Sequence, residues 1–193
     1  MLNNLEKYEV VLASQSPRRR TLLKELLRDF KVTSVEVKEI FPAGLTPEEA
    51  ALYLAQLKAR AFDQWDKYEN PLLITADTIV CFGNKILGKP ENADEAKEML
   101  GFLSGKVHEV ISGVCIKTPA LEKSVAAKTK VHFKELEDEE INYYVTNYKP
   151  FDKAGSYGIQ EWIGYIGVDS IEGSFYNVMG LPVQKLYKEL RKF

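Results

Sequence analysis

Three consecutive arginines, Arg18–Arg20, follow a Ser-Pro pair near the start of the chain. The apolar residues 10–13 predict a short strand, and Ser16-Pro17 is typical of a helix start, because serine caps helices and proline fits their first position. The arginines then fall in the first helical turn, where the helix dipole disfavours cations. A bound anion would explain them, since backbone N–H groups and guanidinium groups would converge on one phosphate chain. The alternative is a solvated basic turn.

A single aspartate, Asp77, interrupts the nearly all-apolar stretch from Leu72 to Phe82. Such a stretch is typical of a strand in the middle of a sheet. Burying an unpaired carboxylate is costly, so Asp77 must be paired, metal-bound or protonated. Ionisable groups in such places often have perturbed pKa values and serve function. The structural alternative is an aspartate that caps a neighbouring loop.

A lysine, Lys58, lies on the apolar face of a predicted helix. That helix begins at Thr46-Pro47, with Glu49 completing a capping box, and its apolar stripe continues to Trp65. A lysine on such a face usually extends along its stem to water. Alternatively, its ammonium reaches into a pocket, and the helical position alone leaves both interpretations open.

Hydrolysis of a phosphoanhydride needs cations for the phosphates and a carboxylate that activates water directly or by holding Mg²⁺ or Mn²⁺. Candidate carboxylates are Glu39, Asp77, Asp152 and Glu172, and candidate cations are Arg18, Arg19, Lys58, Lys89 and Lys153. His108 and His132 lack metal-ligand spacing, and we interpret them as structural or surface residues. The chain has no GxxxxGK[ST] loop, which excludes a P-loop NTPase, and no G-x-S-x-G or paired Cys/His motif for acyl chemistry.

Composition bounds the class of protein. The chain has 193 residues, 45% of them hydrophobic and 28% charged, which is ordinary for a globular protein. Its formal net charge of −2 argues against broad binding to nucleic acid or membrane surfaces. Cys81 and Cys115 lie in apolar runs and are expected to be buried thiols in a reducing cytosol. With no signal-peptide pattern and no apolar run near the ~20 residues that span a bilayer, we expect a cytoplasmic protein.

Strands and helices alternate along the chain without a clear break, which predicts a single α/β domain over residues 1–193. Leucine spacing extends the first helix to Phe30. The apolar residues within 159–171 predict a strand, and a helix is expected after Pro182.

Several short segments, taken in order, resemble the Maf family of nucleoside triphosphate pyrophosphatases. These segments are Leu12–Arg19, Lys58–Ala61, Thr75–Val80, Gly88–Pro90, Leu103–Val110, Asp152–Gln160 and Asn177–Pro182. The resemblance spans nearly the whole chain. It implies a twisted mixed β-sheet flanked by helices, with two lobes around a central cleft. It also implies cleavage of a nucleoside triphosphate between the α- and β-phosphates, a divalent metal cation (Mg²⁺ or Mn²⁺), a cytoplasmic location and a homodimer.

The resemblance also implies roles for individual residues. Asp77 matches the proton acceptor that activates water, and Glu39 matches an acidic position that would hold the metal together with Asp77. By the same matching, Ser14, Arg18 and Arg19 would bind the phosphates, and Lys58 and Lys89 would line the cleft. Thr78 would also bind the substrate, and Gln160 would meet the base.

The triplet Ala76-Asp77-Thr78, together with Gln160, resembles the branch of the family that hydrolyses dTTP and UTP. The branch acting on 7-methyl-GTP is expected to carry a Ser-Asp-Gln type triplet instead. A glutamine amide can pair with both O4 and N3–H of a uracil or thymine edge. Glu161 departs from the pattern, because the family usually has glycine there.

Two alternative functions stay open at this point. One is a pyrophosphatase for modified nucleotides such as 7-methyl-GTP, 5-methyl-UTP or pseudouridine triphosphate. The other is a nucleotide-binding regulator of cell division that barely hydrolyses its ligand. Retention of Asp77 and of the lysines favours the enzyme.

Overall fold

The computed structural model describes residues 2–193, which group into two compact units. The first unit consists of the chain up to Asp77, Ser112–Ala127 and Gly180–Phe193. The second unit consists of Thr78–Ile111 and Lys128–Met179. That residues 1–193 form a single domain stays a prediction.

The strands form one mixed sheet. They are β1 (Glu9–Ala13), β2 (Lys31–Thr33), β3 (Pro71–Phe82), β4 (Lys85–Leu87), β5 (Val107–Lys117), β6 (Glu122–Phe133) and β7 (Val168–Glu172). Their order is β2-β1-β3-β5-β6-β7, with β4 paired to β3. β1 runs parallel to β2 and β3, whereas β4 is antiparallel to β3 and β7 to β6. The predicted mixed sheet flanked by helices is therefore confirmed.

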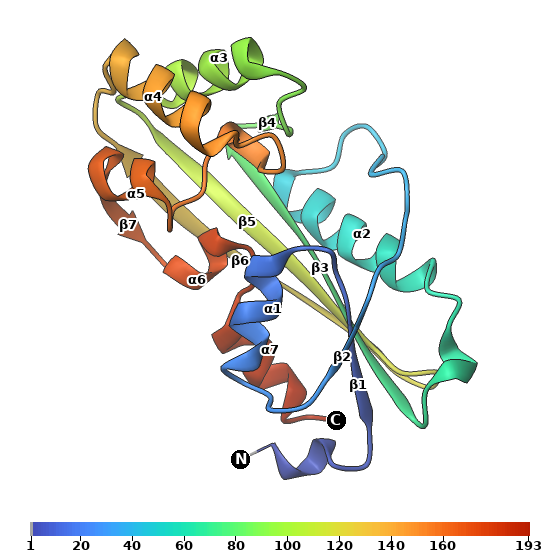
Figure 1. Ribbon diagram of the computed structural model, residues 1–193. Helices are drawn as coiled ribbons and strands as arrows, with labels where there is room; N and C mark the ends of the chain where they lie inside the picture. Colours follow the sequence, from blue (N-terminus) through green and yellow to red (C-terminus); the bar gives the residue numbers. More distant parts are fainter. Residues whose placement is uncertain (1) are drawn as a thin grey trace. The chain divides into compact units, whose positions relative to one another are not determined.

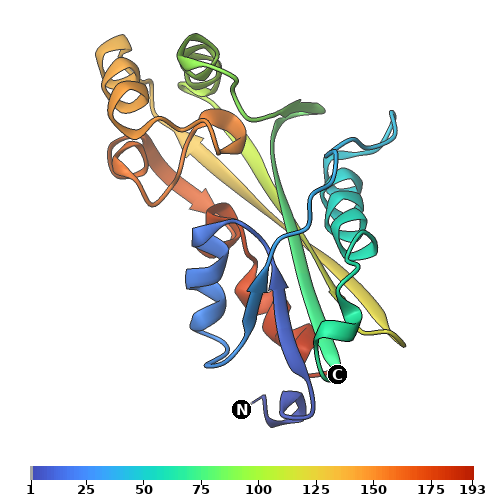
Figure 2. The same cartoon turned by 45° about the vertical axis from the view of Figure 1, so that its right-hand side comes forward.

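The first unit carries the helices α1 (Pro17–Lys24), α2 (Pro47–Arg60) and α7 (Val183–Leu190), with the short 3-10 helices η1 (Asn3–Leu5) and η2 (Trp65–Lys67). α1 and α7 lie on one side of the strands of this unit and α2 lies on the other (Figures 1 and 2). Ala55 and Ala59 of α2 pack on Val11, Leu73 and Cys115 from three neighbouring strands. Small side chains on α2 let its backbone lie close to the sheet.

The start signals of these helices are confirmed, but two predicted ends are wrong. The Ser16 hydroxyl accepts from the backbone N–H of Arg19, yet α1 stops at Lys24 rather than reaching Phe30. The chain closes in a tighter turn there, because it must reach β2 within a few residues. α2 likewise ends at Arg60, and Trp65 belongs to η2, where its ring meets Phe62 edge-on.

The second unit carries α3 (Ala93–Leu103), α4 (Asp138–Tyr148), η3 (Ala154–Ser156), α5 (Trp162–Gly167) and α6 (Phe175–Met179). α3 packs against α4 and η3, and α4 also contacts α5 (Figure 1). The core between them is apolar and includes Leu100, Leu103, Val131, Ile141 and Ile163.

The strand predicted within 159–171 is only partly confirmed. The strand β7 begins at Val168, whereas the preceding residues form the helix α5. A Cβ atom on Gly164 would lie 1.8 Å from the carbonyl oxygen of Ile159, so the glycine allows a helical turn to pack directly on backbone. A short apolar run does not by itself distinguish such a helix from a strand.

His108 is a buried structural residue of the second unit, as predicted. Its Nε2 lies 2.7 Å from the Tyr157 hydroxyl, and its ring contacts Phe133 and Tyr157 edge-on. Burial lowers the pKa of His108 to about 4, with a smaller contribution from His132. His132 itself is 30% exposed and lies 3.0 Å from Glu172.

Acidification should therefore destabilise the protein through His108. Between the ordinary histidine pKa of about 6.5 and the folded value, the unfolded chain binds a proton that the folded chain does not. Stability should fall as the pH drops through this window, by about 3 kcal/mol in total at its lower end. Urea unfolding at pH 7, 5.5 and 4.5 measures the slope. His108→Gln should flatten it far more than His132→Gln, which removes only the smaller contribution to the pKa of His108. Equal slopes in both variants would contradict the assignment.

Candidate active site

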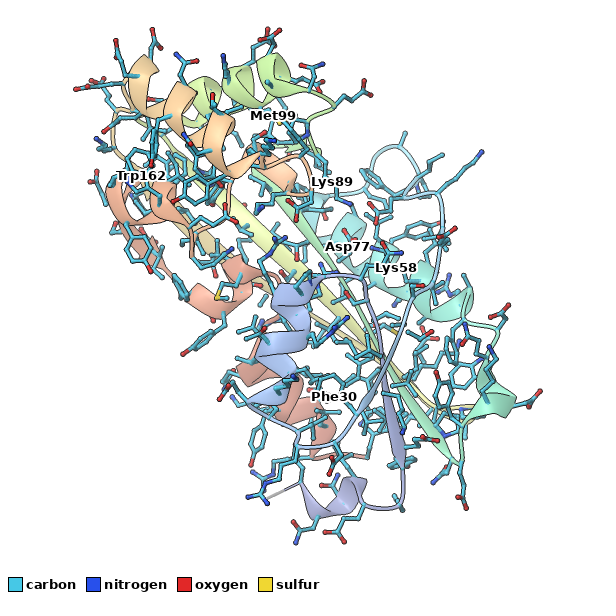
Figure 3. The ribbon with its side chains drawn as sticks, viewed as in Figure 1. Phe30, Lys58, Asp77, Lys89, Met99 and Trp162 are labelled. Carbon is cyan, nitrogen blue, oxygen red and sulfur yellow. The ribbon has the colours of Figure 1, made fainter. Side chains whose placement is uncertain are left out.

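Lys58 and Asp77 form the centre of the candidate site. The Lys58 ammonium nitrogen lies 2.5 Å from Oδ1 of Asp77 and 2.8 Å from Oε1 of Glu39. Figure 3 shows the two labelled side chains pointing toward one another, Lys58 from α2 and Asp77 from β3. Asp77 is 7% exposed and is paired with Lys58, which is one of the three states, paired, metal-bound or protonated, that its burial predicted. The Lys58 ammonium pairs with two carboxylates, and the Lys58 side chain is mostly buried.

The approach of α2 to the sheet brings this pair together. The capping box of Thr46 and Glu49 sets the start of α2. The buried hydroxyl of Thr75 on β3 donates to the carbonyl oxygen of Ala55 at 2.7 Å, which ties helix and strand together two residues before Asp77. A Cβ atom on Gly113 of β5 would lie 2.4 Å from the carbonyl oxygen of Ala51. Only glycine leaves room for α2 at this point.

Arg19 connects the first turn of α1 to the strand that carries Asp77. Its Nε donates to the carbonyl oxygen of Gly180, and its Nη1 donates to that of Ala76, both at 2.8 Å. Burial lowers the pKa of Arg19, while the negative charge of Asp77 opposes this shift. Arg19 therefore holds the backbone on the N-terminal side of Asp77, a contact that the arginine cluster in the sequence did not indicate.

The turn between β1 and α1 is built by serine side chains. Ser14 is 8% exposed, and its hydroxyl accepts from the backbone N–H of Ser16 at 3.2 Å. The backbone N–H of Ser14 donates to the carbonyl oxygen of Thr33 at 2.9 Å, which ties this turn to β2. Arg18, half-buried, is the first arginine of α1. The predicted arrangement of strand, polar turn and capped helix is confirmed.

Three other predicted site residues belong to the second unit. Thr78 is half-buried on β3, directly after Asp77 in the chain, and Lys89 is exposed after β4. Gln160 lies between η3 and α5. Its side-chain oxygen Oε1 is buried and has no hydrogen-bond partner among the described residues. This oxygen is an acceptor in need of a donor.

The remaining candidate charges have other surroundings. Glu172 on β7 lies 3.0 Å from His132 and 3.4 Å from Lys130, all on the exposed faces of two paired strands. Lys153 is 8% exposed and lies 2.7 Å from Asp152. Glu172 therefore stabilises a strand pair at the surface.

Comparison with known proteins decides the family. Residues 9–193 match the family model described as Maf-like protein. This chain belongs to the Maf-like family.

The Maf-like chain has full-length relatives. It is 54% identical to a protein of Phocaeicola vulgatus and 55% identical to one of Parabacteroides distasonis, covering 100% of both chains in each pair. A Flavobacterium johnsoniae protein is 50% identical over 96% of this chain and 95% of its own. All three are named dTTP/UTP pyrophosphatase.

Among solved structures, a HAM1 protein from Coxiella burnetii covers 96% of the Maf-like chain and 100% of its own, at 17% identity and a TM-score of 0.49. This likeness is too distant to bear on function. Residues 2–193 contain no helix with the length and apolar character to cross a membrane.

The donor set of this Maf-like site fits a hard divalent cation. Glu39 and Asp77 each place a carboxylate oxygen on the Lys58 ammonium, so two oxygen ligands face one positive charge. Within residues 2–193, no three His, Cys, Asp or Glu side chains gather as a ready-made metal cage. Mg²⁺ commonly binds to one or two carboxylates and takes its other ligands from water and substrate phosphates.

Sequence reasoning missed one polar cluster in the second unit. Tyr144 is fully buried on α4, and its hydroxyl binds Glu161 and the backbone of Gly158. Lys153 also pairs with Glu161, at 3.1 Å. The available signal was that a buried tyrosine hydroxyl usually finds a hydrogen-bond partner.

Proposed function

We propose that this protein is a nucleotide pyrophosphatase that hydrolyses dTTP and UTP to the nucleoside monophosphate and pyrophosphate and so removes unwanted nucleotides from the pool. The pairing of Asp77 with Lys58, at 2.5 Å, carries the proposal. Full-length relatives named dTTP/UTP pyrophosphatase support it at 54% and 55% identity. We place the enzyme in the cytoplasm, in keeping with its two free buried cysteines, and expect the homodimer that the family resemblance implies.

Asp77 is proposed as the general base. Its carboxylate accepts a proton from the water that attacks the phosphoanhydride bond. Lys58 fixes the carboxylate in place through its ammonium, and it holds Glu39 from the same nitrogen. Arg19 fixes the backbone beside the base by binding the Ala76 carbonyl. Lys58 and Arg19 thus hold the Asp77 carboxylate and its backbone in position before the substrate binds.

The phosphates are assigned to the cations and to the serine turn. Arg18 and Arg19 offer guanidinium groups for phosphate oxygens at the N-terminus of α1, and Ser14 offers a hydroxyl in the preceding turn. Lys58 and Lys89 add ammonium charges. Each of these assignments rests on the match to the family motifs.

Glu39 and Asp77 are the residues that would hold Mg²⁺ or Mn²⁺. When bound, such a cation neutralises phosphate charge and stabilises the leaving pyrophosphate.

Gln160 is proposed to recognise the base, with Thr78 beside the catalytic aspartate. The Gln160 Oε1 atom is a buried acceptor without a partner in the described chain. The N3–H group of uracil or thymine is a donor of the required kind, and the O4 atom of the base can accept from the Gln160 amide nitrogen.

The test is pyrophosphate release from dTTP, UTP, CTP, dATP, GTP and 7-methyl-GTP, each with Mg²⁺ or Mn²⁺. We expect dTTP and UTP to react at least about 100-fold faster than the purines, because a site built around buried polar groups rejects a mismatched base strongly. A preference for 7-methyl-GTP would overturn the choice of branch. Absence of release from every nucleotide would refute the enzyme and leave a nucleotide-binding regulator.

A further inference from the structure

The carboxylate of Glu161 does not serve the helix that it precedes. Glu161 occupies the N-cap position of α5 but makes no side-chain capping bond there. Its Oε2 accepts from the hydroxyl of Tyr144, and its Oε1 lies 3.1 Å from the Lys153 ammonium. Lys153 is 8% exposed. The carboxylate is therefore held by Tyr144 of α4 and by Lys153 instead of by the first turn of α5.

The Tyr144 hydroxyl extends this connection to the backbone. It accepts from the N–H of Gly158 at 3.0 Å while it donates to Glu161. Burial raises the pKa of Tyr144, and Glu161 raises it further, so the hydroxyl stays a proton donor at neutral pH. A residue on α4 thus fixes the segment from Gly158 to Glu161 at both ends.

Gln160 and Glu161 lie against the same glycine. A Cβ atom on Gly158 would lie 2.8 Å from Nε2 of Gln160 and 2.9 Å from Cδ of Glu161. Oε2 of Glu161 would lie 3.1 Å from the same point, so the negative charge of this carboxylate lies near the amide nitrogen of Gln160 and favours that end of the amide there over Oε1. The other terminal atom of Gln160, Oε1, is the buried acceptor described above.

We propose that Glu161 and Tyr144 are positioning residues that hold the Gln160 amide in one orientation and so make the site select uracil and thymine over cytosine. This inference rests on the proposed function. Uracil and thymine present an O4 acceptor and an N3–H donor, whereas cytosine presents an amino donor and an N3 acceptor. If the Gln160 amide turns by 180°, its oxygen and nitrogen exchange places, and the amide then matches the donor and acceptor of cytosine. Selectivity between these bases therefore requires that the amide be prevented from turning.

The test compares kcat/KM for UTP and CTP in Glu161→Ala and Tyr144→Phe. We expect the UTP:CTP ratio to fall about tenfold in each, the worth of roughly one hydrogen bond, chiefly through KM. Glu161→Gln keeps an acceptor for Tyr144 and should restore part of the ratio; it also serves if the alanine variant does not fold. Tyr143→Phe is the matched control, because Tyr143 is the preceding residue on α4 and its half-exposed ring packs on Trp162.

If the UTP:CTP ratio in Glu161→Ala and Tyr144→Phe equals that in Tyr143→Phe, the inference is overturned. Equal losses of kcat/KM for UTP and CTP would also overturn it, because they indicate a merely structural role. If the wild-type protein hydrolyses neither nucleotide, the proposed function fails, and calorimetric binding of UTP and CTP replaces turnover. Preferential UTP binding that Tyr144→Phe abolishes would then support the positioning role, and binding without preference would refute it.

Discussion

Asp77→Asn should lower kcat for UTP and dTTP by about 10³-fold or more, the range that loss of a general base produces. Asparagine has nearly the same shape and keeps an oxygen that can accept from the Lys58 ammonium, which lies 2.5 Å away in the wild-type protein. It lacks the basicity to take a proton from water. Pyrophosphate release measures the loss, and calorimetry should show that UTP still binds within about tenfold of the wild-type affinity.

Asp169→Asn is the matched control, because Asp169 is an exposed residue of β7 outside the candidate site. It should leave turnover unchanged. Turnover by Asp77→Asn within about tenfold of wild type would show that Asp77 is not the base. A loss accompanied by unfolding, seen as a lowered melting temperature, would assign Asp77 a structural role instead.

Gly113→Ala should destabilise the protein by about 3 kcal/mol, because overpacking against backbone cannot be relieved by a change of rotamer. The added carbon would lie 2.4 Å from the carbonyl oxygen of Ala51 and 2.8 Å from the backbone nitrogen of Leu52. Either α2 or β5 must shift, and α2 carries Lys58. Urea unfolding measures the stability, and pyrophosphate release below the melting temperature should fall as well.

The same substitution at Gly101 should instead stabilise the protein. Gly101 lies within α3, and a Cβ atom there would have no neighbour within 4 Å. Alanine should stabilise this helix by about 0.5–1 kcal/mol, because it loses less backbone entropy on folding. If Gly113→Ala proved as stable as Gly101→Ala, the close approach of α2 to β5 would be refuted.

Local signals predicted the elements that position the site. The capping residues Ser16 and Thr46 each begin a helix where the sequence placed it. The apolar residues 10–13 predicted β1, and the apolar run around Asp77 predicted β3. These features depend on neighbouring residues alone, and therefore they are visible in the sequence.

The sequence did not reveal which residues far apart in the chain contact one another. That Asp77 needed a partner followed from its apolar surroundings, but its choice of Lys58 depends on how α2 lies on β3. The carbonyl partner of Arg19 at Gly180 is separated from it by 161 residues. No local pattern specifies such a contact, because backbone carbonyls are the same at every position. The buried hydroxyl of Tyr144 is a further example, since helical spacing shows that a side chain is buried but not what its polar end meets.

The first unit draws its last segment, Gly180–Phe193, from the end of the chain. Leu186 and Leu190 of α7 are fully buried, Lys185 donates to the carbonyl oxygen of Ala126 at 2.6 Å, and the carbonyl oxygen of Leu190 accepts from Asn4 at 2.8 Å. During translation, this unit therefore lacks part of its core until the segment Gly180–Phe193 has left the ribosome. Until that segment emerges, the nascent chain exposes this apolar surface, which can then aggregate or bind chaperones.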